Sequence, residues 1–404
     1  MFCRDVPTRF VGCDAVSRTA RVLVITFLES AATILIERGL YFYTHERLDF
    51  TGAENLGLAL AWGVAYVVGA QLSHGVSRRL SEKRLLALTL VGQVLGHAVL
   101  CVWAGSLAVV AMTMAIGCVT GLKWPVVESY VAAGRTPTDQ AKAIGRFNLS
   151  WAGSVPLALV AAGPLIAWRP QALFVAAAAL SLVSLVLTWP LARRLVHLPH
   201  DHPERPSAGQ MARLRGLLTS ARWSMLTGYS LMWILAALLP GVFERLGVGV
   251  AWATALSGLL DVFRFLAFLT LGLYSGWHNR GGPLAFVIIG LPAGFFMALF
   301  GGGLATVLCG ELLFGAAIGM TYYAALYYAM VVKNAAVDAG GSHESLIGAG
   351  FAAGPASGLV GNWLAPAVGG AIVGRIVGVA PLVVVCAVGA AVSLVKVARA
   401  RPAT

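Results

Sequence analysis

Apolar runs of about 20 residues, each long enough to cross a bilayer as a helix, recur along the whole chain. Short polar or basic stretches separate them. Twelve such runs can be marked, roughly at 22–43, 54–77, 85–104, 107–133, 140–166, 169–192, 222–246, 250–276, 283–300, 304–331, 344–372 and 378–398. The pattern predicts an all-α integral membrane protein with twelve transmembrane helices.

Two segments in different halves of the chain resemble each other. Gly121–Tyr130 reads GLKWPVVESY and Gly319–Tyr328 reads GMTYYAALYY, so both have an aromatic residue in fourth place and tyrosine in tenth place. A loop and a glycine-rich helix that opens on Ile-Gly follow each segment, at Ile144 and Ile347. A repeat in the same direction is typical of a transporter built from two similar halves. We therefore expect two pseudo-symmetric six-helix bundles.

The composition supports a membrane protein, because 58% hydrophobic and only 11% charged residues exceed what a soluble core could bury. A net charge of +12 could indicate a nucleic-acid binder. Most of the 29 lysines and arginines, however, fall at the termini and in even-numbered loops. By the positive-inside rule both termini are cytoplasmic, so we expect a multi-pass protein of the inner (cytoplasmic) membrane and no nucleic-acid partner. No cleavable signal peptide is expected, because the first apolar run is too long for one.

A hydrophilic, proline-containing stretch divides the chain in the middle. It predicts an N-terminal bundle over 1–192, a cytoplasmic linker over 193–221 and a C-terminal bundle over 222–404. The linker also contains five residues of metal-ligand type: His197, His200, Asp201, His202 and Glu204. A proline-broken stretch offers no preorganised geometry, so we expect no metal site.

The first run contains three polar residues at successive intervals of four. Glu29, Thr33 and Glu37 therefore share one face of a helix. Because an ionised carboxylate is costly in hydrocarbon, we expect this face to line a solute-binding cavity. For Glu37 and the adjacent Arg38, an alternative is that both lie near the outer interface and extend to water.

In the second half, Asp261 and Arg264 lie one turn apart near the middle of the eighth run. Such a pair can neutralise itself along the helix, or it can bind the opposite charges of a solute. We favour the second interpretation because of the central depth. Tyr322 and Tyr323 of the tenth run are expected to line the same cavity. Gln93 and His97 of the third run are treated as packing residues.

The fourth and fifth runs carry further charged and aromatic residues. Lys123 and Glu128 are five positions apart and diverge on an ideal helix. Arg146, Asn148 and Trp151 lie at a matching depth on the next helix, so we predict a Glu128–Arg146 ion pair and place Asn148 and Trp151 in the cavity. The ion pair could be an inert strut or could gate the cavity, and both interpretations stay open.

The loop after the second run, from Gly69 to Arg84, contains a glycine and four cations that include Arg78 and Arg79. It resembles the loop between helices 2 and 3 of the major facilitator superfamily, although Ser73 and His74 stand where that family has an aspartate. The cations could also serve only to set orientation. The ninth run contains no charge, the sixth has none after Arg169 and the twelfth has none before Lys396, which fits the peripheral helices of that fold.

This resemblance implies a secondary transporter whose two bundles rock about a central cavity. We expect a small polar, anionic or zwitterionic organic solute, proton coupling and a monomer without cofactors. Glu29, Asp261 and then Glu128 are the candidates for the proton carrier, Glu29 first because no cation adjoins it in sequence. The alternatives are a multidrug efflux pump and a non-transporting membrane sensor or scaffold. An enzyme is not expected, because the sequence contains neither His-Glu-x-x-His nor Gly-x-Ser-x-Gly.

Overall fold

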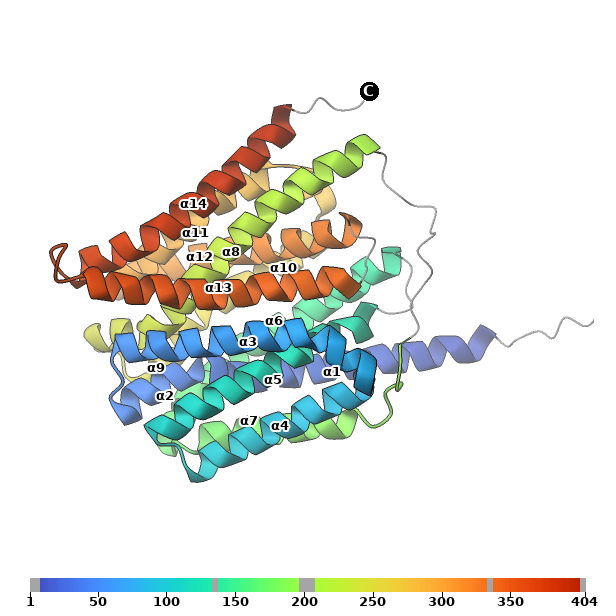
Figure 1. The fold of residues 1–404 in the computed structure, drawn as a ribbon, viewed down its shortest axis with the longest axis horizontal. Coiled ribbons are helices and arrows are strands. Elements are labelled where there is room, and N and C mark those ends of the chain that lie inside the picture. The colour runs from blue at the N-terminus through green and yellow to red at the C-terminus, as the bar shows by residue number, and fades with distance from the viewer. Residues whose placement is uncertain (1–7, 133–136, 196–207, 333–336, 400–404) are drawn as a thin grey trace, which may run out of the picture.

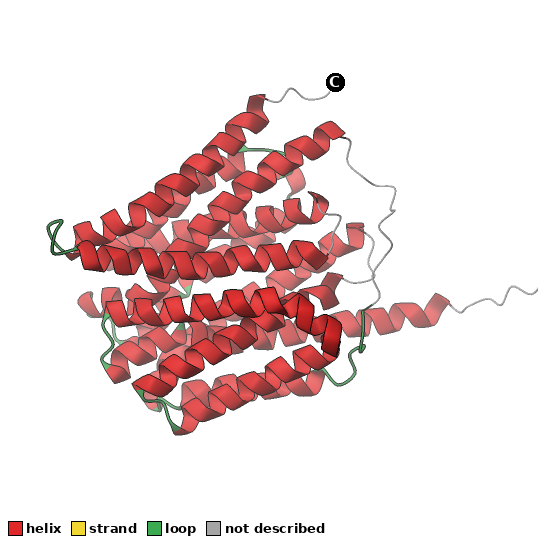
Figure 2. Ribbon diagram, in the orientation of Figure 1, coloured by secondary structure: helices red, strands yellow, loops and turns green. Residues whose placement is uncertain are grey.

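The computed structural model describes residues 8–132, 137–195, 208–332 and 337–399. In this part of the chain the secondary structure is entirely helical (Figure 2). The α-helices are α1 (Thr8–Glu37), α2 (Gly39–Leu48), α3 (Gly52–Leu80), α4 (Glu82–Val102), α5 (Ser106–Ala132), α6 (Pro137–Trp168), α7 (Ala172–Leu187), α8 (Ala208–Arg245), α9 (Val250–Ser257), α10 (Leu259–Leu273), α11 (Gly282–Phe300), α12 (Leu304–Val332), α13 (Val337–Leu364) and α14 (Ala371–Arg399), with a short 3₁₀ turn, η1 (Ser275–Trp277).

These elements form the twelve predicted spans, because α1 continues into α2 and α9 continues into α10. Within the described residues, 10 helical stretches are long and apolar enough to cross a membrane. The other two spans are α7, which is apolar but shorter, and α13, which is rich in glycine and alanine. The all-α prediction is confirmed, and the chain is a multi-pass membrane protein.

The helices form two groups that lie side by side, α1–α7 and α8–α14 (Figure 1). The main contacts between the groups join α3 to α13 and α6 to α9 and α10. We call the end at which α1 begins and α14 ends the terminal end of the bundle. The helix α8 begins at Ala208, so residues 208–221 are helical where the sequence predicted linker. The histidine cluster of the predicted linker lies outside the described residues.

The helices predicted to be peripheral do lie on the outside. Valine and isoleucine side chains of α7, α11 and α14 are exposed, among them Val186, Ile289 and Val385. In a bilayer these side chains face lipid tails, which accept them without cost. A charged side chain on such a face would be costly, and α7 and α11 contain none.

Gly163 allows the two groups of helices to approach closely. A Cβ at this position would lie 2.3 Å from Thr254 Oγ1 and 2.5 Å from the Val250 carbonyl oxygen, so only glycine lets α6 pack directly on α9. This contact lies at the end of the bundle opposite the terminal end.

Replacing Gly163 by alanine is expected to lower the stability of the detergent-purified protein by about 1–3 kcal/mol, because the added methyl group forces α6 away from α9. The measurement is the melting temperature. Gly57→Ala is the matched control, since no atom lies within 4 Å of a Cβ built there. Equal melting temperatures for both variants would contradict the close packing.

Candidate functional site

A cavity opens between the two groups of helices and has about 690 Å³ of empty space, counting the part that is open to solvent. Its walls come from α1, α3, α5 and α6 on one side and from α8, α10, α12 and α13 on the other. The lining side chains are Ser30, Thr33, Ile34, Glu37, Arg38, Tyr66, Trp124, Glu128, Phe147, Trp151, Val155, Tyr229, Met232, Trp233, Arg264, Tyr322, Glu344, Ile347 and Phe351.

Charged groups of both signs and aromatic rings share this lining. The carboxyl groups are those of Glu37, Glu128 and Glu344, and the cations are Arg38 and Arg264. Such a lining can hold a charged solute by hydrogen bonds and ion pairs while its rings cover the rest of the solute.

Trp151 lies at the centre of the aromatic part of the wall. The guanidinium carbon of Arg264 lies 4.6 Å from the centroid of its ring, within range of a cation–π interaction. The rings of Phe268 and Tyr322 meet it edge-on, at centroid distances of 5.4 and 5.2 Å. Three residues of the second group of helices therefore hold this indole of the first group in position.

Asp261 joins the two groups of helices behind the lining. Its carboxylate accepts a hydrogen bond from Arg38 of the first group, and its Oδ1 lies 2.5 Å from Nη2 of Arg264 on its own helix. All three side chains are buried. Arg38 is therefore not at the membrane interface, and the alternative interpretation of that residue is wrong. Asp261 and Arg264 do pair along their helix, with Arg38 as a third member.

Two interrupted helices create this cluster. The first span breaks at Arg38 and the eighth at Gly258. At the second break the Asp261 amide donates to the Gly258 carbonyl, three residues back, which leaves the Ser257 carbonyl without its usual helical donor. Nη2 of Arg38 donates to that carbonyl oxygen at 2.9 Å. The break thus supplies a backbone acceptor in a place where an intact helix would have none.

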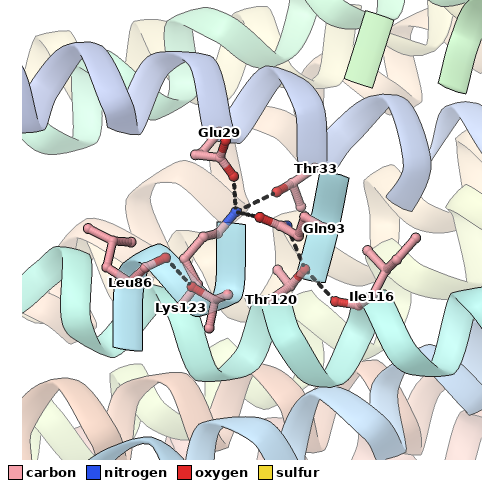
Figure 3. Close-up of polar contacts among 8 residues, drawn as sticks. Glu29, Thr33, Leu86, Gln93, Ile116, Thr120 and Lys123 are labelled. Carbon is pink, nitrogen blue, oxygen red and sulfur yellow. Dashed lines mark hydrogen bonds and ion pairs between the residues drawn. The ribbon is translucent and has the colours of Figure 1, made fainter. Parts of the chain in front are cut away.

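Lys123 is the centre of a second buried cluster, which lies inside the first group of helices (Figure 3). Its Nζ lies 2.6 Å from Glu29 Oε2, 3.2 Å from Gln93 Oε1 and 3.3 Å from Thr33 Oγ1. The Gln93 amide in turn donates to Thr120 Oγ1. One ammonium group therefore ties α1, α4 and α5 together. Glu29 has a cation beside it after all, which removes the reason for ranking it first as proton carrier.

Glu128 does not pair with Arg146, so that prediction is wrong. Arg146 is exposed, and none of the ion pairs among the described residues joins the two. The carboxyl group of Glu128 faces the other group of helices instead and lies within hydrogen-bonding reach of the carboxyl group of Glu344 on α13. Tyr66 of α3 also donates its hydroxyl hydrogen to Glu344 Oε2.

The structure brings together only part of the predicted site. The predicted residues that line the cavity are Thr33, Glu37, Glu128, Trp151, Arg264 and Tyr322. Those that are buried outside the lining are Glu29, Lys123, Asn148 and Asp261. Those that lie elsewhere are Tyr323, whose ring packs on Trp277, and the exposed residues Arg78, Arg79 and Arg146. The serine found in place of the family's aspartate, Ser73, donates to the Leu122 carbonyl and so links α3 to α5.

Several lining residues were not predicted from sequence. They are Tyr66, Tyr229, Trp233, Glu344 and Phe351, of which four are aromatic. An aromatic side chain in an apolar run gives no signal of its own, because lipid and cavity both accept it. Glu344 did carry a signal, since it is a carboxyl group in a helix that is otherwise rich in small residues. Gln93, which was treated as a packing residue, accepts a hydrogen bond from the Lys123 ammonium group.

Comparisons with known proteins agree with this geometry. The family model described as Major Facilitator Superfamily matches residues 22–359. The nucleoside transporter NupG has 15% identity and a TM-score of 0.65, with 95% of this chain and 99% of that chain covered. A bacterial homologue of the human lysosomal transporter Spinster has 13% identity and a TM-score of 0.65, with 98% and 99% covered. The fucose:proton symporter FucP of E. coli has 15% identity and a TM-score of 0.61, with 94% and 99% covered. No curated protein sequence matches the chain.

Proposed function

The chain belongs to the major facilitator superfamily, and from this membership and the chemistry of the cavity we propose that it transports a small polar or charged organic solute by alternating access, coupled to protons. It is a membrane transporter and not an enzyme. The finer parts of the proposal are the class of solute, the coupling ion, the inner-membrane location with cytoplasmic termini and the monomeric state.

The observation that carries the proposal is the mixed charge of the cavity lining. Three carboxyl groups and two guanidinium groups border one space between the halves. Charged side chains at membrane depth are costly, and they are retained where they bind a solute or an ion. A cavity for a purely apolar solute would need none of them.

Proton coupling is supported by two considerations. Among proteins of the same fold is one that is named a fucose:proton symporter. In addition, Asp261 bonds to Arg38 across the two halves, so a change in their orientation alters the charges around this carboxyl group. Glu29 stays a weaker candidate, because its partner Lys123 belongs to the same half.

The runner-up is export of amphipathic compounds. It is favoured by the aromatic part of the lining, where Trp124, Trp151, Trp233 and Phe351 surround the same space. Flat rings accept many apolar shapes, whereas paired charges select a few polar ones. A transport panel that contains both kinds of compound separates the two candidates.

Uptake into proteoliposomes under an imposed pH gradient tests the proposal. We expect at least one polar or charged metabolite of the panel to accumulate only while the gradient lasts. If none accumulates, or if accumulation is unaffected when the gradient is collapsed by a protonophore, proton-coupled transport is ruled out.

Glu37→Gln is expected to raise the KM for this solute about tenfold or more, because a hydrogen bond to a charged group contributes about 1.5–3 kcal/mol. Glu37 lines the cavity and has no ion-pair partner among the described residues, so the change removes charge and leaves no cation unpaired. Glu46→Gln makes the same chemical change at an exposed position of α2 and is the control. An unchanged KM in Glu37→Gln would exclude Glu37 from solute binding.

A further inference from the structure

Two carboxyl groups meet across the interface between the halves. Glu128 lies one turn before the end of α5, and Glu344 lies near the start of α13. Both line the cavity, and their carboxyl groups lie within hydrogen-bonding reach of each other. Since α5 ends and α13 begins at the terminal end, the contact lies on that side of the cavity.

A hydrogen bond between two carboxyl groups requires a proton on one of them. An ionised carboxylate has acceptor oxygens only, whereas a protonated one has an O–H donor. Two carboxylates in this position would repel each other in surroundings of low polarity. We therefore infer one carboxylic acid and one carboxylate at this contact.

No cation compensates the pair directly. None of the ion pairs among the described residues includes Glu128 or Glu344. The hydroxyl group of Tyr66 donates to one carboxyl oxygen of Glu344. The contact between Glu344 and Glu128 therefore depends on a proton carried by one of these two carboxyl groups. The titratable and charged groups that face the pair from neighbouring elements, or adjoin it on its own helices, are Glu37 of α1, Tyr66 of α3, Lys123 of α5, Arg222 and Tyr229 of α8, Arg264 of α10, Tyr322 of α12 and His343 of α13.

The lysine and the two arginines in this set have other partners. Lys123 donates to Glu29, Arg264 pairs with Asp261, and Arg222 donates to Ser342 Oγ at 3.3 Å. His343 packs edge-on against Tyr322, at a centroid distance of 4.8 Å. A proton shared by the two carboxyl groups would therefore be the positive charge between them.

We propose that Glu128 and Glu344 form a proton-binding site between the two halves, which holds one proton while the carboxyl groups touch and drives the halves apart when that proton leaves. In the release step one carboxyl O–H bond breaks and the proton passes to water, which leaves two facing carboxylates. The proposal rests on the transport function inferred above and assigns part of its proton coupling to this pair. Glu29, by contrast, has its partner within one half and cannot report on the orientation of the halves.

The test is a distance measurement between spin labels on the terminal end of each half. His74 on α3 and Arg280 before α11 are exposed and can carry the labels after the native cysteines are replaced. Going from about pH 5 to about pH 8, we expect the ratio of the longer to the shorter distance population to rise at least about fivefold, the lower end of typical coupling factors. Unchanged distances in the otherwise wild-type protein would overturn the proposal.

Three variants locate the response. Glu128→Gln and Glu344→Gln each supply an amide N–H that bonds the remaining carboxylate at any pH, so the shorter distance is expected to persist at both pH values. Glu46→Gln makes the same chemical change at an exposed position and must keep the response. A wild-type response in both Glu128→Gln and Glu344→Gln, or its loss in Glu46→Gln, would overturn the proposal.

This experiment and the uptake assay fail independently. Proton-driven uptake without a pH-dependent distance would leave the transport function standing and remove the carboxyl pair from it. A distance that depends on the pair, in a protein whose uptake ignores the pH gradient, would leave the proton site standing and remove proton-coupled transport.

Discussion

Lys123→Met is expected to destabilise the protein by about 3–5 kcal/mol, the usual effect of removing one partner from a buried ion pair. Glu29 would be left buried without its cation, since Lys123 Nζ is its ion-pair partner, at 2.6 Å. The melting temperature in detergent measures the loss. The loss of stability should be smaller at about pH 5 than at about pH 8. A buried carboxyl group without a cation is tolerated in the folded protein only when it is protonated, and keeping it protonated costs more free energy as the pH rises.

The double variant Glu29→Met/Lys123→Met provides the control for this prediction. Replacing a buried pair by apolar side chains of similar volume is often neutral or stabilising, so most of the lost stability should return. If the double variant melts below Lys123→Met, the destabilisation comes from lost packing and not from an unpaired charge.

Asp261→Asn is expected to have the second large effect. It leaves the buried guanidinium groups of Arg38 and Arg264 without a carboxylate, which should cost about 3–5 kcal/mol and abolish uptake. Arg38→Gln should cost less, because Arg264 still neutralises Asp261. Melting temperature and uptake are the measurements, and the order of the two variants is the critical result.

A matched control exists at the surface. His45 Nε2 and Glu244 Oε2 lie 3.0 Å apart and also join the two halves, but the side chain of Glu244 is 72% exposed. Glu244→Gln should therefore change stability by only about 0–1 kcal/mol. If it destabilises the protein as much as Asp261→Asn, burial is not what makes the Asp261 contact important.

The sequence was sufficient to predict which spans exist, because they follow from the length of the apolar runs. Which helices are peripheral was implied by the resemblance to the superfamily. It also placed Glu29, Thr33 and Glu37 on one stripe of a helix. Only Thr33 and Glu37 line the cavity, whereas Glu29 turns to Lys123. A spacing of four residues fixes which side chains share a face, but it does not tell which neighbouring helix supplies a partner.

The error at Glu128 has a similar cause. Depth in the membrane could be read from position along the runs, and on that basis Glu128 and Arg146 were matched. Depth does not fix the rotation of a helix about its axis, and the rotation of α5 directs Glu128 to Glu344 on α13. The helix breaks at Arg38 and Gly258 were equally hidden, since arginine and glycine also occur inside unbroken helices of this chain, such as Arg264 in α10 and Gly319 in α12.

The interruptions at Arg38 and Gly258 have a mechanical consequence. A helix bends most easily where its backbone ladder is broken, and here two such points touch through one ion pair. We expect them to act as the hinge about which the two halves rotate. Side chains beside the hinge would then move little, whereas the ends of the helices would move furthest. Probes placed at the helix ends therefore report the rotation best.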